Sequence, residues 1–103
     1  MGNCIVVDDN QTIIGVFCEL LDIIGFDVLA TGVNGMDAVK LYEKYHPDLI
    51  FVDMRMPKYD GFFAIRNIRN QAPYSKIVVT SGEITTDDCH LLEDPLKILF
   101  GLR

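Results

Sequence analysis

Residues 49–57 read Leu-Ile-Phe-Val-Asp-Met-Arg-Met-Pro, so that four apolar residues run directly into Asp53. An apolar run without polar alternation is typical of a strand that is buried on both faces, as in a parallel sheet. Similar short runs, rich in β-branched residues, occupy 4–7 and 77–79. We therefore expect three strands of one parallel sheet, each followed at once by polar residues.

Helix-like segments separate these runs along the chain. The first extends over 13–24, ends at Gly25, and would be capped by Asn10 or Thr12. Its apolar residues predict one broad helix face, made of Ile13, Ile14, Val16, Phe17, Leu20, Leu21, Ile23 and Ile24. The remaining pattern predicts a turn at Asn34-Gly35, helices over 36–45, 61–70 and 86–93, and strands over 26–30 and 96–100. The alternation of strands and helices favours an α/β fold with a mostly parallel sheet.

The composition is that of one small globular domain. The chain has 103 residues, 50% of them hydrophobic, and a net charge of −6, so we expect a single domain over 1–103. The acidic balance argues against direct binding to nucleic acid or to an anionic membrane, since both attract basic surfaces. We expect no signal peptide and no membrane span. Cys4, Cys18 and Cys89 lack CxxC spacing, which favours free thiols and a reducing, cytoplasmic location.

Polar side chains gather where the predicted strands end. They are Asp8 and Asp9 after 4–7, Asp53 after 49–52, and Thr80 and Ser81 after 77–79. Each of these residues alone would more simply serve as a helix cap or in a turn. Ligands, however, bind at the carboxyl ends of strands in an open parallel sheet. If these strands are neighbours, we expect all of these side chains to converge at one edge.

Three converging carboxylates, those of Asp8, Asp9 and Asp53, need a partner of opposite charge. They repel one another unless a cation is present or one of them is protonated. Carboxylate oxygens are usual ligands of Mg²⁺, which commonly meets a phosphate as well. A carboxylate also acts as a nucleophile toward phosphorus, and Thr80 and Ser81 offer hydroxyl donors nearby. The pattern therefore predicts a Mg²⁺ site suited to phosphoryl chemistry.

Together these stretches resemble the receiver domain of two-component response regulators. The matching stretches are 5–10 (Ile-Val-Val-Asp-Asp-Asn), 34–38 (Asn-Gly-Met-Asp-Ala), 49–57 with Asp60-Gly61 after it, and 77–82 (Ile-Val-Val-Thr-Ser-Gly). They follow the family's order and spacing over nearly the whole chain. The resemblance implies a doubly wound, five-stranded parallel sheet of the flavodoxin-like strand order 2-1-3-4-5.

The resemblance also implies a role for each matching site residue. Asp53 would accept a phosphoryl group from a sensor histidine kinase or a phosphotransfer protein. Asp9 would bind Mg²⁺ directly, Asp8 would hold it through water, and Arg55 would add its backbone carbonyl. Thr80 would bond a phosphoryl oxygen and shift, which changes the affinity for a downstream effector protein. Such a domain is a signalling switch and not an ordinary enzyme, although it assists its own phosphorylation and dephosphorylation.

The last part of the chain departs from the family pattern. The family's lysine at the end of the fifth strand has no clean counterpart, because spacing leads to Gly101 or Leu102 while Lys97 would start that strand. Phe100 is the nearest aromatic for the family's switch position. We expect the family's final helix to be missing. The domain would then be C-terminally truncated, degenerate, or covered by a partner. The absence of the helix would expose apolar sheet surface and a bare edge strand, which predicts association with a second copy.

Other interpretations of the same residues stay open. A receiver-like interaction module that no longer signals by phosphate fits the missing lysine and helix. A hydrolase of the haloacid-dehalogenase type shares the aspartate nucleophile and Mg²⁺, but its Asp-x-Asp pattern after the first strand is lacking. A flavin-binding module would need a phosphate loop there that is rich in Ser, Thr and Gly. Phosphate uptake by the wild type that is lost in Asp53→Asn would support the phosphorylated signalling switch over the interaction module that no longer signals by phosphate.

Overall fold

The computed structural model describes residues 2–81 and 98–100, the side chains of Ser81 and of 98–100 excepted. Its elements are β1 (Asn3–Val7), α1 (Gln11–Ile24), β2 (Asp27–Gly32), α2 (Gly35–Tyr45), β3 (Leu49–Asp53), α3 (Gly61–Gln71), β4 (Ile77–Ser81) and β5 (Ile98–Phe100). The strands form one five-stranded parallel sheet of order β2-β1-β3-β4-β5. The predicted α/β fold is confirmed, its strand order included.

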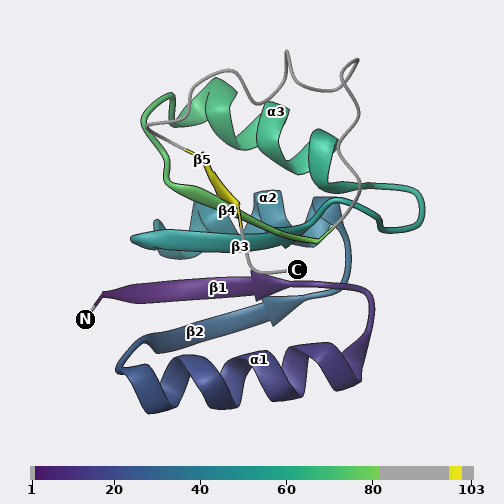
Figure 1. Cartoon of the computed structure of the whole chain (residues 1–103). Helices are drawn as coiled ribbons and strands as arrows, with labels where there is room; N and C mark the ends of the chain where they lie inside the picture. The colour runs from purple at the N-terminus through teal and green to yellow at the C-terminus, as the bar shows by residue number, and fades with distance from the viewer. Residues whose placement is uncertain (1, 82–97, 101–103) are drawn as a thin grey trace.

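The described helices cover the two faces of the sheet unequally. Figure 1 shows α1 alone on one side and α2 with α3 on the other. Side chains alternate between the faces along each strand. The core under α2 and α3 contains, among others, Ile5, Ile50 and Ile77, and the core under α1 contains Phe51 and Val78. Both faces of the central strands are therefore buried, which explains their unbroken apolar sequences.

Capping residues set the ends of α1 and α2. Asn10, one of the two predicted caps, accepts two backbone N–H groups of the first turn with its side chain. Gly25 ends α1 in the left-handed conformation, with φ of 100°. Asn34 caps α2 with its side chain, which accepts the backbone N–H of Asp37. The turn predicted at Asn34-Gly35 is therefore the first turn of that helix.

Only part of the predicted apolar face of α1 packs on the sheet. Ile14 and Leu21 are buried, and Phe17 and Cys18 pack beside them. The other apolar residues of that face are exposed: Ile13, Val16, Leu20, Ile23 and Ile24. The predicted apolar face is thus wider than the contact between α1 and the sheet, since the helical period does not show which part of an apolar face is covered. Neither α1 nor any other described helix is long and apolar enough to cross a membrane.

The strands at the two edges of the sheet differ from their predicted bounds. β2 reaches Gly32, beyond the predicted 26–30, because its pairing with β1 continues past an irregularity between Cys4 and Ile5. β5 pairs with β4 over 98–100, the last part of the predicted 96–100. The helix predicted over 86–93 lies outside the described residues. The region after Phe100 also lies outside the described residues, so the expected absence of the family's final helix stays a prediction.

Candidate functional site

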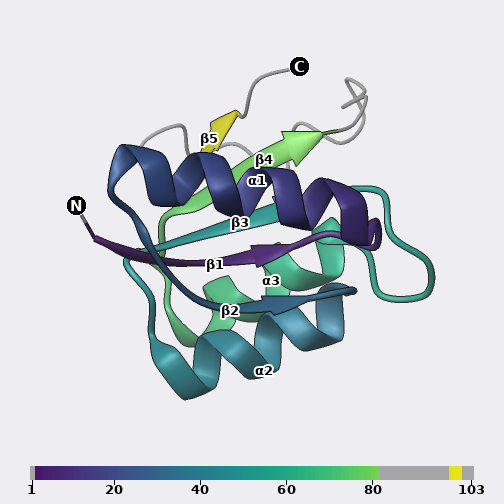
Figure 2. The ribbon, with the colours of Figure 1, turned by 90° about the horizontal axis from the view of Figure 1, so that it is seen from below.

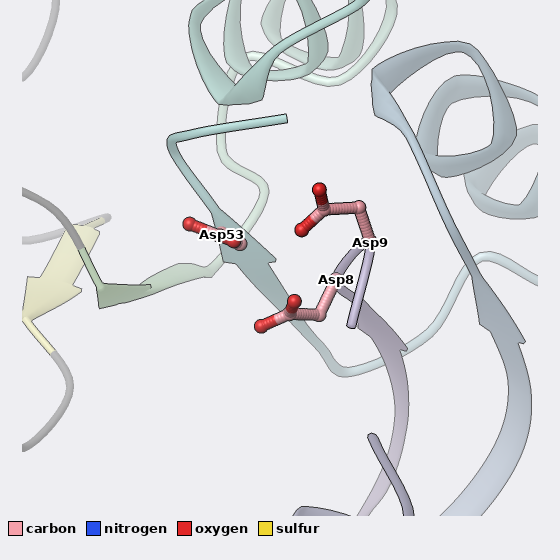
Figure 3. Close-up of side chains that lie close together, drawn as sticks. All are labelled: Asp8, Asp9 and Asp53. Atoms are coloured by element: carbon pink, nitrogen blue, oxygen red, sulfur yellow. The ribbon is translucent and has the colours of Figure 1, made fainter. Parts of the chain in front are cut away.

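Parallel pairing brings the ends of β1 and β3 together at one edge of the sheet. Val7, the last residue of β1, pairs with Val52, so Asp8 and Asp53 follow at neighbouring positions. One carboxylate oxygen from each of Asp8, Asp9 and Asp53 lies within 4.8 Å of those of the other two. Figure 3 shows the three side chains gathered at these strand ends. The predicted convergence of the acidic residues is confirmed.

Burial and backbone hydrogen bonds hold two of these carboxylates in place. Asp8 is 4% exposed and Asp53 is 7% exposed, whereas Asp9 is open to solvent. The backbone N–H of Asn10 donates to Asp8 Oδ1, and that of Arg55 donates to Asp53 Oδ1, each at 2.9 Å. In both cases the carboxylate accepts from the residue two positions on, which is the usual local bond of aspartate in a turn. Each acid is thus oriented by the chain immediately after its strand ends.

The electrostatics of this acidic cluster favour a bound cation. Burial is the main cause that raises the pKa of Asp8 above its ordinary value of 3.8, and the negative charges of Asp53 and Asp9 raise it further. The backbone N–H of Asn10 lowers the same pKa and offsets part of this effect. A divalent cation among the carboxylates would relieve their repulsion and the cost of burying their charge.

The residues of the cluster fit Mg²⁺ among the common metals. This ion takes oxygen ligands, keeps several waters, and is usually held by one or two carboxylates next to a phosphate. Asp8, Asp9 and Asp53 supply such oxygens, and the exposed Asp9 leaves one side of the cluster open to water. Within the described residues, the cluster contains no cysteine or histidine that would favour zinc.

Replacing Asp8 by asparagine is expected to stabilise the metal-free protein at neutral pH by about 1–2 kcal/mol. The variant keeps an oxygen for the N–H of Asn10 but removes a buried charge that its neighbours repel. Because the pKa of Asp8 is raised in the folded state, metal-free stability falls as the pH rises from 3.8 through the folded-state pKa. The gain should therefore vanish below pH 3.8. Urea unfolding in the presence of a chelator measures the effect.

Asp22→Asn supplies the matched control for this experiment, because Asp22 is exposed on α1 and does not belong to the acidic cluster. It should change the free energy of unfolding by less than about 0.5 kcal/mol. Added Mg²⁺ should stabilise the wild type, and it should stabilise Asp8→Asn less. A metal-free Asp8→Asn protein that is less stable than the wild type would contradict the inferred repulsion.

An irregularity between β3 and β4 decides where Thr80 lies. The strands pair in step as far as Val52 and Val79, but Asp53 then pairs with Ser81, one residue further along β4. Thr80 is therefore the extra residue of a bulge, and it is partly buried. Bulges re-aim side chains and are frequent next to active sites. The backbone thus brings Thr80 and Ser81 to the same edge of the sheet as Asp53.

The loop 54–60, between β3 and α3, borders a cleft of about 650 Å³. Asp9 lines this cleft from the side of β1 and the exposed Arg55 from the loop. The other lining residues are Met54, Met56, Pro57, Asp60 and Phe62. Met54 and Met56 belong to the core, in agreement with the packing role expected for methionine. The cationic Arg55 therefore shares this cleft with Asp9, the solvent-exposed member of the acidic cluster.

Close backbone contacts hold this loop at both of its sides. A Cβ at Gly61 would lie 2.6 Å from Met54 Cα and 2.8 Å from the carbonyl oxygen of Asp53, so only glycine fits there without a shift. On the other side, the N–H of Gly35 donates to the carbonyl of Tyr59, and a Cβ at Gly35 would collide with the loop backbone. The contact with Tyr59 was not predicted. Its only sequence signal is the glycine that follows the helix cap.

The remaining candidates from the sequence lie outside the described residues. They are Lys97, Gly101 and Leu102, which were considered for the lysine position. The backbone of Phe100 pairs with Val79 at the end of β5. The roles suggested for these residues stay predictions.

Comparison with known proteins assigns the chain to a family. The family model of the response regulator receiver domain matches residues 4–93. The chain belongs to the receiver domain family. This receiver domain is 31% identical over 82 residues to chemotaxis protein CheY of Listeria monocytogenes, a match that covers 80% of this chain and 69% of that protein. It is 35% identical over 82 residues to the probable transcriptional regulator ycf27 of Galdieria sulphuraria, covering 79% of this chain and 32% of that protein.

The receiver domain also resembles solved structures over almost its whole length. It superimposes on a chain of the CheX–CheY–BeF3–Mg²⁺ complex of Borrelia burgdorferi with a TM-score of 0.86 and 21% identity, covering 98% of this chain and 77% of that chain. That identity shows the shared fold alone. The receiver domain of a sensor histidine kinase from Pseudomonas aeruginosa, which has a magnesium ion in its active site cleft, gives a TM-score of 0.80 at 25% identity and covers 97% and 84%. The chain spans about a third or less of the transcriptional regulators it matches.

Proposed function

We propose that this receiver domain is the phosphoacceptor of a two-component response regulator and that Asp53 receives the phosphoryl group. The observation that carries the proposal is the position of Asp53, which is 7% exposed and has two further carboxylates within 4.8 Å. Such an arrangement is costly unless it serves a cation and a ligand. The donor would be a sensor histidine kinase or a phosphotransfer protein, in keeping with the family.

Asp53 would act as the nucleophile in this transfer. One of its carboxylate oxygens attacks phosphorus and forms an O–P bond, while the N–P bond to the donor histidine breaks. The imidazole leaves with the electron pair of that bond and takes up a proton from solvent. The N–H of Arg55, bonded to Asp53 Oδ1, keeps the carboxylate oriented during the attack. The hydroxyl of Thr80, at the end of the neighbouring strand, would donate to a phosphoryl oxygen.

Mg²⁺ would be held by the acidic cluster. In the family's pattern, Asp9 binds it directly, Asp8 binds through water, and Asp53 and the backbone carbonyl of Arg55 complete the protein ligands. When bound, the ion offsets negative charge on the transferring phosphoryl group. The chain contributes by fixing its carboxylates at one edge of the sheet in advance, so that little reorganisation accompanies the transfer.

The output of the domain would be a change in its affinity for a downstream effector protein. Phosphorylation of Asp53 would bias a two-state element that includes Thr80. In this role the domain is a cytoplasmic signalling module. It assists its own phosphorylation and dephosphorylation by positioning groups, and it is not an ordinary enzyme. The net charge of −6 disfavours direct contact with nucleic acid or an anionic membrane.

Incubation with acetyl phosphate and Mg²⁺, followed by measurement of the intact mass, tests the proposal. We expect the mass to rise by that of one phosphoryl group, as the acyl phosphate bond of the donor breaks and acetate leaves. The rise should depend on Mg²⁺ and should be absent when a chelator is present. A protein of unchanged mass under these conditions would instead support the receiver-like interaction module that no longer signals by phosphate.

Arg55→Ala is expected to shorten the lifetime of the phosphoryl group on Asp53 by about 2–5-fold, the modest effect typical of an exposed charge. The Arg55 side chain is exposed and lines the same cleft as Asp9. In the phosphorylated protein it would restrict the approach of water to Asp53. Loss of label from the phosphorylated protein measures the rate. Arg66→Ala, which removes an exposed arginine of α3, is the matched control and should leave the rate unchanged. Equal rates for Arg55→Ala and the wild type would rule out this role.

A further inference from the structure

A second cavity lies at the edge of the sheet that is opposite to the acidic cluster. Because the strands are parallel, their amino ends meet at this edge, and Figure 2 shows β1, β2 and β4 pointing away from it. The cavity, which we name the amino-edge pocket, has a volume of about 530 Å³. Sites for small molecules have volumes of roughly 300–1,000 Å³. The lining of the pocket includes Phe26, Tyr42, Asp48, Tyr74, Ser75 and Lys76.

One of these lining residues carries a buried hydroxyl group without a partner. Ser75 is 5% exposed, and its Oγ has no hydrogen-bond partner among the described residues. The backbone N–H of Ser75 donates to the carbonyl of Ala72 at 3.0 Å, so the turn after α3 fixes the residue in this place. A buried hydroxyl that lacks a partner costs free energy, and a ligand oxygen would satisfy it. The amino-edge pocket thus contains a donor in need of an acceptor.

Two lining side chains of opposite charge lie at the starts of neighbouring strands. Asp48 directly precedes β3, where its Oδ2 accepts the backbone N–H of Asn3 at 2.9 Å and leaves lone pairs for further donors. Lys76 directly precedes β4 and is exposed, and its carbonyl accepts the N–H of Ile50 at 3.1 Å. A ligand that has both a carboxylate and an ammonium group would therefore find an opposite charge for each.

Aromatic rings form much of the apolar lining of the pocket. Tyr42 is 7% exposed, and the partly buried Phe26 packs on Phe51 with ring centroids 6.2 Å apart, so the core holds both residues. Tyr74, by contrast, is 82% exposed in the turn before β4. Aromatic rings attract one another in edge-to-face and offset arrangements, beyond the gain from burying their area. A planar ring is therefore the apolar group that this pocket suits.

We propose that the amino-edge pocket binds a free aromatic amino acid. The carboxylate of the ligand would accept from the hydroxyl of Ser75 and pair with Lys76, while its ammonium group would donate to Asp48. Its ring would pack among the aromatic side chains of the lining. This function is additional to phosphoryl transfer, because the pocket and the acidic cluster lie at opposite ends of β1 and β3.

Fluorescence anisotropy of added L-tryptophan tests this proposal. The chain contains no tryptophan, so light that tyrosine does not absorb excites the ligand alone. Two analogues each lack one charge: tryptamine has no carboxylate, and indole-3-propionate has no ammonium group. We expect each analogue to bind at least about 5-fold more weakly than L-tryptophan, since bonds to a charged group are lost. Equal binding of all three compounds, or no binding of L-tryptophan up to about 1 mM, would overturn the proposal.

Ser75→Ala separates ligand binding from a structural role of the hydroxyl. The variant should bind L-tryptophan about 10-fold more weakly, and its affinity for tryptamine should be unchanged because that compound has no carboxylate. Since the hydroxyl has no partner among the described residues, its loss should not destabilise the unliganded protein in urea. Wild-type affinity of Ser75→Ala for L-tryptophan would contradict the proposal.

Lys76→Gln tests the charge that faces the carboxylate of the ligand. It should weaken binding of L-tryptophan by about 3-fold, the size of effect that an exposed ion pair gives, and it should leave tryptamine binding unchanged. The matched control is Lys40→Gln, which removes an exposed lysine of α2 outside the pocket lining and should bind both compounds as the wild type does. Equal losses in the two lysine variants would show a general charge effect and overturn the assignment.

Two further measurements keep this proposal separate from the phosphoacceptor function. Ser75→Ala should take up phosphate from acetyl phosphate at the wild-type level, and Asp53→Asn should bind L-tryptophan as the wild type does. Failure of phosphate uptake by the wild type would thus leave the binding result interpretable, and the reverse holds as well. Binding of L-tryptophan that Asp53→Asn abolishes would place the ligand at the acidic cluster and overturn the proposal.

Discussion

Asp53→Asn is expected to abolish phosphate uptake from acetyl phosphate, with no mass increase above background. Asparagine keeps the shape of the side chain and an oxygen that accepts the N–H of Arg55 at 2.9 Å in the wild type. It lacks the negative charge that makes the carboxylate a nucleophile, and its neutral amide is a poor attacking group. The fold should persist, because the variant also removes one of three carboxylates that lie within 4.8 Å of one another. Intact-mass measurement and urea unfolding of the same samples report the two effects.

The control for Asp53→Asn is again Asp22→Asn, which changes one exposed aspartate outside the acidic cluster and should take up phosphate like the wild type. A phosphorylated Asp53→Asn protein would show that another residue is the acceptor. Peptide mapping of the labelled protein would then identify that residue, and the proposed function would have to be reassigned from Asp53.

Gly61→Ala is expected to destabilise the domain by about 1–3 kcal/mol, the usual cost of overpacking a filled site. The added methyl group would lie 2.6 Å from Met54 Cα and 2.8 Å from the carbonyl oxygen of Asp53. Both neighbours are backbone atoms at the end of β3, so neither yields as a flexible side chain would. Displacing them moves Asp53 as well, and phosphate uptake should therefore slow in parallel. Urea unfolding and the rate of mass increase measure the two changes.

Gly15→Ala is the matched control for that substitution, because the chain offers a second glycine at which the same methyl group meets nothing within 4 Å. Gly15 lies in the interior of α1, where alanine restricts the unfolded chain more than glycine and favours the helix. We expect a gain of about 0.5–1 kcal/mol. Opposite signs for the two substitutions would isolate the close approach at Gly61 as the cause. A Gly61→Ala protein as stable as the wild type would contradict it.

The sequence predicted those parts of the fold that depend on burial of whole strands or on contacts between neighbouring residues. The strands β1, β3 and β4 are buried on both faces, so their apolar runs had to be unbroken. The acids at the ends of the neighbouring strands β1 and β3 then had to meet at one edge of the sheet. Asn10 and Gly25 end α1 by local chemistry that involves only neighbouring residues. Because such features depend on a few adjacent positions, they can be predicted from the sequence.

Features that depend on distant parts of the chain were not predictable. The bulge that places Thr80 arises where β4 pairs with β3, and β4 itself contains no glycine or proline that would mark the position. The periodicity of α1 shows which residues are apolar but does not show which part of a wide apolar arc meets the sheet, so the exposure of Ile23 was missed. The contact between Gly35 and Tyr59 joins two turns that lie in separate parts of the sequence.

The junction between Gly35 and Tyr59 limits how the loop 54–60 is able to vary in length. Surface loops generally accept inserted residues at small entropic cost. At its start, this loop packs against Gly61, and near its end it contacts Gly35 in the first turn of α2. At both glycines an added methyl group would collide with the loop or strand backbone. An inserted residue would detach Tyr59 from Gly35 and leave both backbone groups in need of new partners. The turn at Tyr74, 82% exposed, is the better place for a tag or a fused peptide.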